Sequence, residues 1–148
     1  MNSTGLYSDI GTGLVEQIKT LLTNNITENG LEDKIYNMYD DFDELPAVVV
    51  ANEGATEYLP NTNIFQYTIT VTVLSEPNTG DHVQLHALRN QDVMNWIVND
   101  SLAAELMTLF DATVNVYYIS WPSHDYSISA GRVFSSEQTL EIIASPAS

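Results

Sequence analysis

The segment from Ile64 to Leu74 constrains the fold more than any other part of this chain. Large apolar side chains alternate there with polar ones. The apolar set is Phe65, Tyr67, Ile69, Val71 and Val73, and the polar set is Gln66, Thr68, Thr70 and Thr72. Because successive side chains of a strand point to opposite faces of its sheet, this period of two predicts a strand with one apolar and one polar face. A sheet covered on one face only is typically antiparallel.

Helices are predicted to cover the apolar face. From Ser8 to Asn24 the apolar residues fall on one arc of a helix, although Gly11 and Gly13 each cost about 1 kcal/mol relative to alanine. The helix from His82 to Val98 is apolar over more than half of its circumference. This breadth predicts a contact besides the sheet, either with another subunit or with the next helix, from Leu102 to Phe110.

Four further strands are expected from runs of β-branched and aromatic residues. They span 34–39, 47–51, 112–121 and 132–144. In the third of these strands, Val114, Val116 and Tyr118 are expected on one face. The polar segments Asn52 to Asn63 and Pro122 to Gly131 are predicted to be loops.

The chain has 148 residues, of which 44% are hydrophobic, enough for one domain with its own core. No repeat or linker divides it, so residues 1–148 are predicted to form a single domain. The predicted fold class is α+β: an antiparallel sheet of about four to five strands, with the N-terminal helix and a central helix pair packed on one face. We expect no signal peptide in Met1 to Ser8 and no membrane helix.

The charge balance narrows the choice of partners. Four lysines and arginines oppose twenty aspartates and glutamates, which gives a formal net charge of −16. A chain this acidic is not expected to bind nucleic acid by neutralising phosphates, nor to bind anionic membranes. Two interpretations stay open: the charge keeps the protein soluble by self-repulsion, or it keeps the surface from adhering to DNA that passes nearby.

The histidines are the first candidates for chemistry, since the absence of cysteine excludes thiolate catalysis and cysteine-ligated zinc. His82 and His86 are four residues apart on a predicted helix, a spacing that can place two imidazoles on one metal ion. Val83 stands where the metalloprotease pattern needs a glutamate, so packed or interface histidines are favoured. His124 and Asp125 lie near several serines, but no Gly-x-Ser-x-Gly turn marks a nucleophile.

The other polar clusters are also interpreted as non-catalytic. Asp40, Asp41, Asp43 and Glu44 offer oxygen ligands for calcium, but the glycine of an EF-hand loop is missing and a solvated acidic loop is favoured. The stretch Gly11-Thr12-Gly13 lacks the rest of a nucleotide-binding fingerprint. We therefore predict no catalytic, cofactor-binding or metal-binding residue and no enzymatic activity. A small metal-dependent hydrolase is the alternative of a different class.

Large apolar residues in or beside the polar segments are candidate interface anchors. The set is Tyr58, Leu59, Trp121 and Tyr126. Aromatic residues are enriched in the buried centres of protein interfaces, although these four could equally cap the ends of their own sheet. The segments 53–61 and 123–131 are predicted to be loops that form the docking surface.

Two stretches give the order of elements a recognisable form. Leu45-Pro46-Ala47-Val48-Val49-Val50 follows the first helix and a short strand, and Tyr67-Thr68-Ile69-Thr70-Val71-Thr72-Val73 follows a polar segment. Together with the helix from His82 to Asn99 and the two C-terminal strands, they resemble the tail-terminator, or tail-completion, proteins of tailed bacteriophages. The resemblance covers about Leu14 to Ile143 and rests on the order of elements, not on a diagnostic motif.

This resemblance implies a structural role without catalysis. Proteins of this family form a ring, commonly a hexamer, on the last ring of the tail tube, end its polymerisation and dock head-completion proteins. The implied partners are further copies of this chain, the tail-tube protein and a head-completion or neck protein, with DNA passing through the ring without specific binding. The implied location is the tail or neck of a virion assembled in the host cytoplasm, with no cofactor and no membrane. Another neck, connector or tail-tube component is the alternative.

Overall fold

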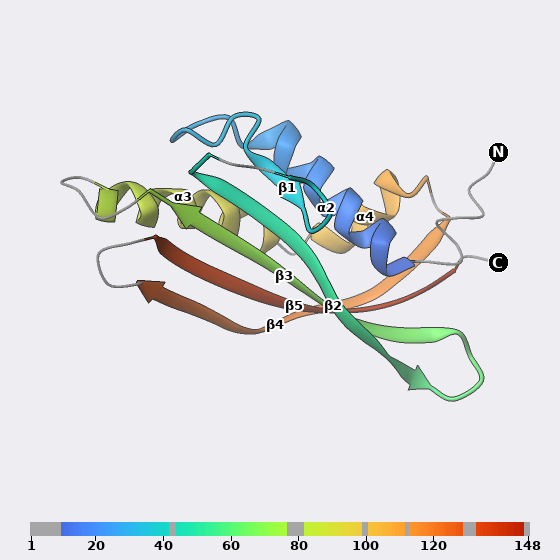
Figure 1. Ribbon diagram of the computed structural model, residues 1–148. Coiled ribbons are helices and arrows are strands. Elements are labelled where there is room, and N and C mark those ends of the chain that lie inside the picture. Colours follow the sequence, from blue (N-terminus) through green and yellow to red (C-terminus); the bar gives the residue numbers. More distant parts are fainter. Residues whose placement is uncertain are drawn as a thin grey trace.

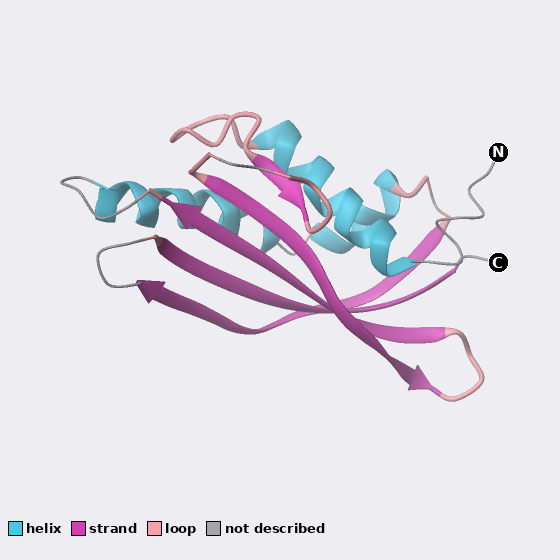
Figure 2. Cartoon of the chain, in the orientation of Figure 1, coloured by secondary structure: helices cyan, strands magenta, loops and turns pink. Residues whose placement is uncertain are grey.

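Three described helices lie on one face of a five-stranded sheet in the computed structural model (Figure 1). The structure describes residues 10–41, 44–76, 82–98, 101–111, 113–128 and 133–146, with the backbone alone for residues 82 and 123–128. The elements in chain order are α2 (Ile10–Asn25), β1 (Ile35–Asn37), β2 (Ala47–Leu59), β3 (Ile64–Ser75), α3 (His82–Ile97), α4 (Leu102–Leu109), β4 (Val114–Ile128) and β5 (Phe134–Pro146). Figure 2 shows the two layers, with the described helices all on the same side of the sheet.

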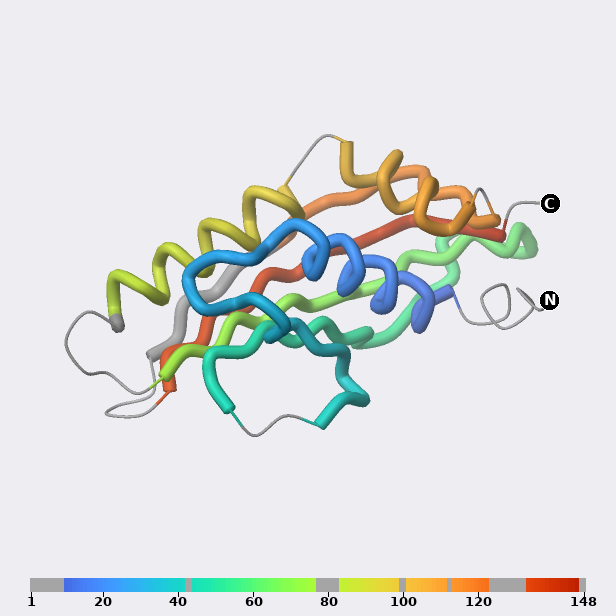
Figure 3. Tube along the Cα trace, turned by 90° about the horizontal axis from the view of Figure 1, so that it is seen from above, coloured from blue at the N-terminus to red at the C-terminus, as the bar shows by residue number. Residues whose placement is uncertain are grey.

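The strand order in the sheet is β1-β2-β3-β5-β4. Neighbouring strands are antiparallel, except that the short strand β1 is parallel to β2, where Ile35 lies opposite Val48 and Asn37 opposite Val50. Seen from above, α3 and α4 follow one another along one side of the sheet, and α2 lies beside them (Figure 3). The predicted α+β class, with an N-terminal helix and a central helix pair on one face, is therefore confirmed.

The alternation in β3 builds the core between the two layers. Fully buried side chains from both layers meet there: Leu14, Ile18 and Leu22 of α2, Ile69, Val71 and Val73 of β3, and Leu140 and Ile142 of β5. Each of these side chains stabilises the fold by about 1.5–3 kcal/mol relative to exposure. Gly11 is buried where α2 crosses β2, and a β-carbon there would collide with the side-chain amide of Asn52. The close approach of α2 to β2 therefore explains why residue 11 is a glycine.

The hairpin of β2 and β3 extends beyond the rest of the sheet (Figure 1). Residues 52–59, predicted as part of a loop, continue β2 instead, and 60–63 form the turn. The prediction was wrong because residues 53–60 are all exposed, so the alternation of buried and exposed side chains that marks a strand is missing. Register shifts next to Gly54 (φ 144°) and before Leu59 interrupt the pairing with β3.

The edge strand β4 departs from the prediction in two ways. It continues along β5 to Ile128, so part of the loop predicted from Pro122 to Gly131 is strand. A register shift between Val116 and Tyr118 inserts one extra residue, and Tyr118 then lies opposite Ile143. Because a bulge reverses the side-chain alternation, Tyr118 is 59% exposed whereas Val116 is buried. The expectation that these two side chains share a face was wrong.

Lysines hold two members of the acidic run that follows β1. Lys19 Nζ of α2 lies 2.8 Å from Asp40 Oδ2, and Lys34 Nζ lies 3.2 Å from Glu44 Oε1. Asp43, the third acid of this run, lies outside the described residues. The contact between Lys19 and Asp40 ties α2 to the turn after β1.

Replacing Lys19 with methionine is expected to raise the pKa of Asp40 towards its ordinary value of 3.8. The hydrogen bond from Lys19 lowers this pKa most, and the bond from the backbone amide of Asn37 lowers it further and remains. Because both side chains are about one-third exposed, the loss of unfolding free energy should stay below about 1 kcal/mol. Carbon-13 NMR titration of the Asp40 carboxyl measures the change. Lys34→Met is the matched control, and equal pKa changes in both variants would contradict the contact.

Candidate interface and a polar pocket

An exposed apolar surface lies where the base of the β2–β3 turn meets the edge of the sheet. Six residues line a cavity of about 470 Å³ there: Tyr58, Leu59, Ile64, Tyr117, Tyr118 and Ile143. We call this surface the hairpin patch. Four of these side chains, those of Tyr58, Leu59, Tyr117 and Tyr118, are about half exposed. The Tyr117 hydroxyl lies 2.8 Å from Ser145 Oγ, which fixes one ring against β5.

The chemistry of the hairpin patch suits association between proteins. Single exposed apolar residues are normal on protein surfaces, but a contiguous group of them, rich in tyrosine, is typical of an interface. All six lining residues are uncharged, although the whole chain carries a net charge of −16. The residues that line the hairpin patch therefore add no charge that would repel a second acidic protein.

The structure brings two of the four sequence-predicted anchors together. Tyr58 and Leu59 lie side by side in the hairpin patch. Trp121 lies apart from them, half-buried and packed against the hydrophobic core. Its indole Nε1 is buried and has no hydrogen-bond partner among the described residues. The side chain of Tyr126 lies outside the described residues, so the interface role of all four stays a prediction.

Sequence reasoning did not identify Tyr117 and Tyr118, two of the three tyrosines of the hairpin patch, as interface candidates. The sequence did contain a sign of an exposed aromatic side chain, namely two adjacent tyrosines in one predicted strand. In a regular strand one of the two must point away from the core. The predicted alternation placed Tyr118 on the same face as Val114 and Val116. This hid the exposure of Tyr118, because the bulge after Val116 is not visible in the sequence.

Of the three histidines, His86 has a described side chain, and it is packed between α3 and the sheet. Its Nδ1 lies 2.6 Å from Ser75 Oγ of β3, and its Nε2 lies 2.7 Å from Ser136 Oγ of β5. The ring stacks on Phe134, with 5.6 Å between the ring centroids. Burial lowers the pKa of His86 below its ordinary value of 6.5, and the charge of Arg89 lowers it further.

The other residues considered for chemistry form no metal-binding group among the side chains that the structure describes. The side chains of His82 and His124 lie outside the described residues. Within the part of the chain that the structure describes, no group of three or more histidine, aspartate or glutamate side chains could hold a metal ion. His86 instead connects two strands to the helix above them, which is a structural function.

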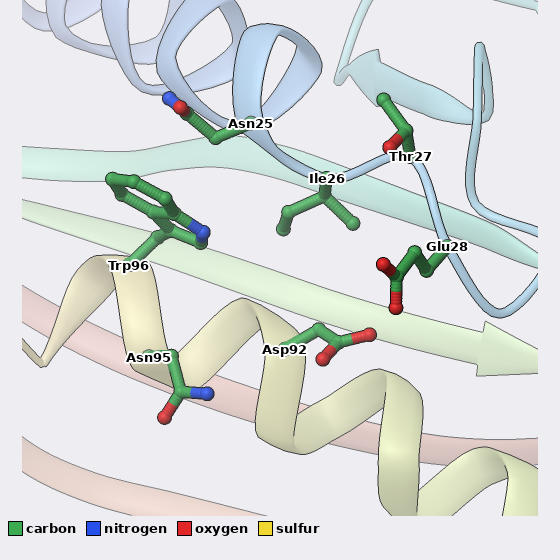
Figure 4. A pocket seen from close by; sticks show the side chains of 7 residues that line it. All are labelled: Asn25, Ile26, Thr27, Glu28, Asp92, Asn95 and Trp96. Atoms are coloured by element: carbon green, nitrogen blue, oxygen red, sulfur yellow. The ribbon is translucent and has the colours of Figure 1, made fainter.

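A polar pocket of about 200 Å³ lies between α2 and α3 (Figure 4). Residues 25–28, at the end of α2 and just after it, line one side, and Asp92, Asn95 and Trp96 of α3 line the other. Figure 4 shows the carboxylates of Glu28 and Asp92 turned towards the same space, which the indole of Trp96 borders on another side. Asp92 Oδ2 accepts a hydrogen bond of 2.6 Å from the side-chain amide of Asn29.

Comparison with known proteins gives one line of evidence, at the level of the fold. No family model and no curated protein matches this sequence. A chain in the virion of a native gene transfer agent (GTA) particle is structurally similar, with a TM-score of 0.55 and 6% sequence identity, over 93% of this chain and 95% of its own length. The fold is one found in a virion. At this identity the likeness shows the fold alone.

The structural similarity spans almost the whole of both chains, so it concerns the complete fold and not a part of it. Among the described residues, no helix is long and apolar enough to cross a membrane.

Proposed function

We propose that this chain is a structural subunit of a tailed virus-like particle. In this role it forms a ring on the head-proximal end of the tail tube, ends the polymerisation of the tube and joins the tail to a head-completion protein. The observation that carries the proposal is the fold, which spans 93% of this chain and 95% of a virion chain. The resemblance of the sequence to tail-terminator proteins agrees with it, and neither argument needs a catalytic residue.

Ring formation requires a surface that copies of the chain can share, and the hairpin patch is the best candidate. A ring closes through head-to-tail contacts, in which one surface of a subunit meets a different surface of the next. The patch includes Tyr58 and Leu59, two of the predicted anchors, and its six members are uncharged. Aromatic side chains in such a surface are the residues that most often dominate binding energy.

The charge of the chain gives the ring a further property. Six copies carry 6 × −16 = −96 formal charges. A central channel lined by part of this charge repels phosphate groups, so DNA passes through without adhering. An electrostatic map of the assembled ring tests this idea, and a neutral or basic channel would remove it.

The experiment for the proposed function is to determine the assembly state of the purified full-length chain. Native mass spectrometry and negative-stain electron microscopy are expected to show isolated rings of constant copy number. Long filaments would instead indicate a tube subunit, which stacks without a stop. A strict monomer at high concentration, absent from any particle, would overturn the proposal.

The similarity to a virion chain fits a second candidate, a different neck, connector or tail-tube component. This alternative keeps the particle but changes the position of the subunit within it. Labelling the chain in an assembled particle and locating the label by electron microscopy separates the two. A label at the junction of tail and head supports the terminator, and labels along the tube support the tube component.

A further inference from the structure

A cavity of about 220 Å³ lies between α2 and α4. Leu21 and Asn24 of α2 line one side of it, and Glu105, Thr108 and Leu109 of α4 line the other. We call this cavity the α2–α4 pocket. Most of its surface is apolar, in contrast to the polar pocket between α2 and α3. An apolar cavity with one acid suits a long side chain that has an apolar stem and a charged end.

The carboxylate of Glu105 indicates that the α2–α4 pocket has an occupant. Its Oε2 atom is buried and has no hydrogen-bond partner among the described residues. The ion pairs of the described residues do not include Glu105 either. Burying a carboxylate oxygen without a hydrogen bond costs free energy, which a donor that enters the pocket would recover. The last side-chain torsion of a glutamate is broad, so the carboxylate can turn towards such a donor.

An arginine side chain matches the walls of this pocket. Its aliphatic stem can lie against Leu21 and Leu109, and its guanidinium group can donate paired hydrogen bonds to the carboxylate of Glu105. The Thr108 hydroxyl donates its own proton to the carbonyl oxygen of Ala104 at 3.0 Å, which leaves the hydroxyl oxygen to accept a further hydrogen bond. The pocket therefore offers acceptors and apolar contacts to one arginine.

The basic residues of the chain narrow the choice of arginine. The chain has four lysines and arginines, and three of them pair with acids of the same chain. These pairs are Lys19 with Asp40, Lys34 with Glu44, and Arg89 with Glu76. The fourth is Arg132, which lies outside the described residues, between the end of β4 and the start of β5. Arg132 is therefore the cation that a second copy can offer to Glu105.

Arg132 cannot reach the α2–α4 pocket of its own chain. It stands two residues before Phe134, where β5 begins, and two residues span at most about 7 Å. The pocket lies far along the sheet, because Leu109 is soon followed by Val114, which pairs with Pro146 at the end of β5. The 13 residues of β5 extend about 40 Å. Figure 3 likewise shows α4 well separated from the start of β5.

We propose that Arg132 of one copy enters the α2–α4 pocket of the next copy and pairs there with Glu105. A contact between two different surfaces of the same chain is head-to-tail, the type that closes rings. The inference rests on the proposed function and deepens it, because it names one contact between neighbouring subunits of the ring. The hairpin patch shares no residue with this contact, so both can act in the same ring.

Charge reversal at either residue tests the pair. Glu105→Arg and Arg132→Glu each place like charges opposite each other, so native mass spectrometry is expected to show monomers where the natural chain forms rings. Glu32→Arg makes the same charge change as Glu105→Arg at an exposed position outside the pocket, and it should still form rings. Circular dichroism checks that each variant is folded. The milder Glu105→Gln should raise the dissociation constant between neighbouring subunits about tenfold or more.

A mixture of the two charge-reversed variants tests whether the pair joins different copies. In such a mixture, every contact between one variant and the other is a pair of opposite charges. Rings of alternating variants are therefore expected, although neither variant assembles alone. Mixing would not restore a pair that forms within one chain.

Three results would overturn the inference: rings in either charge-reversed variant under the conditions where the natural chain forms them, a mixture that stays monomeric, and equal loss of rings in the Glu32→Arg control. Rings that survive Glu105→Arg would leave the pocket to a different partner and would not affect the proposed function. A natural chain that stays monomeric would instead overturn the proposed function and this contact with it. The two failures are therefore distinguishable.

Discussion

Replacing Tyr118 with aspartate is expected to abolish ring formation while leaving the monomer folded. Tyr118 is 59% exposed in the hairpin patch, so the variant loses little buried surface on folding, and the cost should stay below about 1 kcal/mol. At an interface the same change removes an aromatic anchor, which typically costs 2 kcal/mol or more of binding free energy. It also buries a carboxylate that has no partner, which adds a desolvation cost. The prediction rests on the proposed self-association.

Native mass spectrometry of the variant measures the loss of assembly, and thermal unfolding followed by circular dichroism measures the stability of the monomer. Tyr39→Asp is the matched control, because Tyr39 is 68% exposed and lies outside the hairpin patch. The control is expected to form rings like the natural chain. Equal loss of assembly in the two variants would show that the added charge acts generally, and intact rings in the Tyr118 variant would remove the hairpin patch from the interface.

Acidification is expected to destabilise the fold through His86. Burial lowers the pKa of His86 in the folded protein, so below pH 6.5 the unfolded chain binds a proton that the folded protein does not. The neutral histidine therefore imposes no penalty above pH 6.5. As the pH falls from 6.5 towards the lowered pKa, the free energy of unfolding decreases by up to about 1.4 kcal/mol per pH unit. Urea unfolding at pH 7.5 and pH 5.5 measures the difference.

The rest of the chain titrates as well, so the contribution of His86 needs a control variant. A net charge of −16 means that acidification also reduces repulsion between carboxylates, which acts in the opposite direction. His86→Gln keeps a neutral side chain that can bond to the hydroxyls of Ser75 and Ser136 and removes the titrating group. The natural chain should lose more stability than this variant between the two pH values. The same pH dependence in both proteins would show that protonation of His86 is not involved.

The parts of the fold that were predicted from the sequence are those whose side chains alternate between the core and the surface. The alternation in β3 and the apolar arc of α2 identified the two layers, because burial on one face leaves a period in the sequence. The outer half of β2 pairs with β3 while its side chains are exposed, which leaves no such period, and the end of β4 pairs with β5 along a segment that is polar in sequence. They were therefore predicted as loops. The extra residue before Tyr118 was also not predicted, so the face of the sheet on which Tyr118 lies was assigned wrongly.

The candidate sites were likewise predicted only in part. Tyr58 and Leu59 were identified from the sequence because large apolar residues in a polar segment are unusual. The polar pocket was not identified, since it brings Glu28 together with Asp92 and Trp96, more than sixty positions along the chain, through the packing of α3 beside α2. Sequence spacing carries no information about such a contact. His86 was interpreted as a packed or interface histidine, but its bonds to Ser75 and Ser136 depend on the register of β3 and β5, which the sequence does not show.

The short strand β1 pairs with Val48 to Val50 and ends at Asn37, which leaves the rest of β2 with a neighbouring strand on one side. Free edges of this kind recruit strands from other molecules and can lead to aggregation. Here the edge carries the exposed acids Glu53 and Glu57 and is interrupted at Gly54. A second copy that added its own edge would bring like charges together across an irregular register. For a protein whose proposed task is to end a polymer, this edge guards against a different and unlimited polymer, one made of its own sheets.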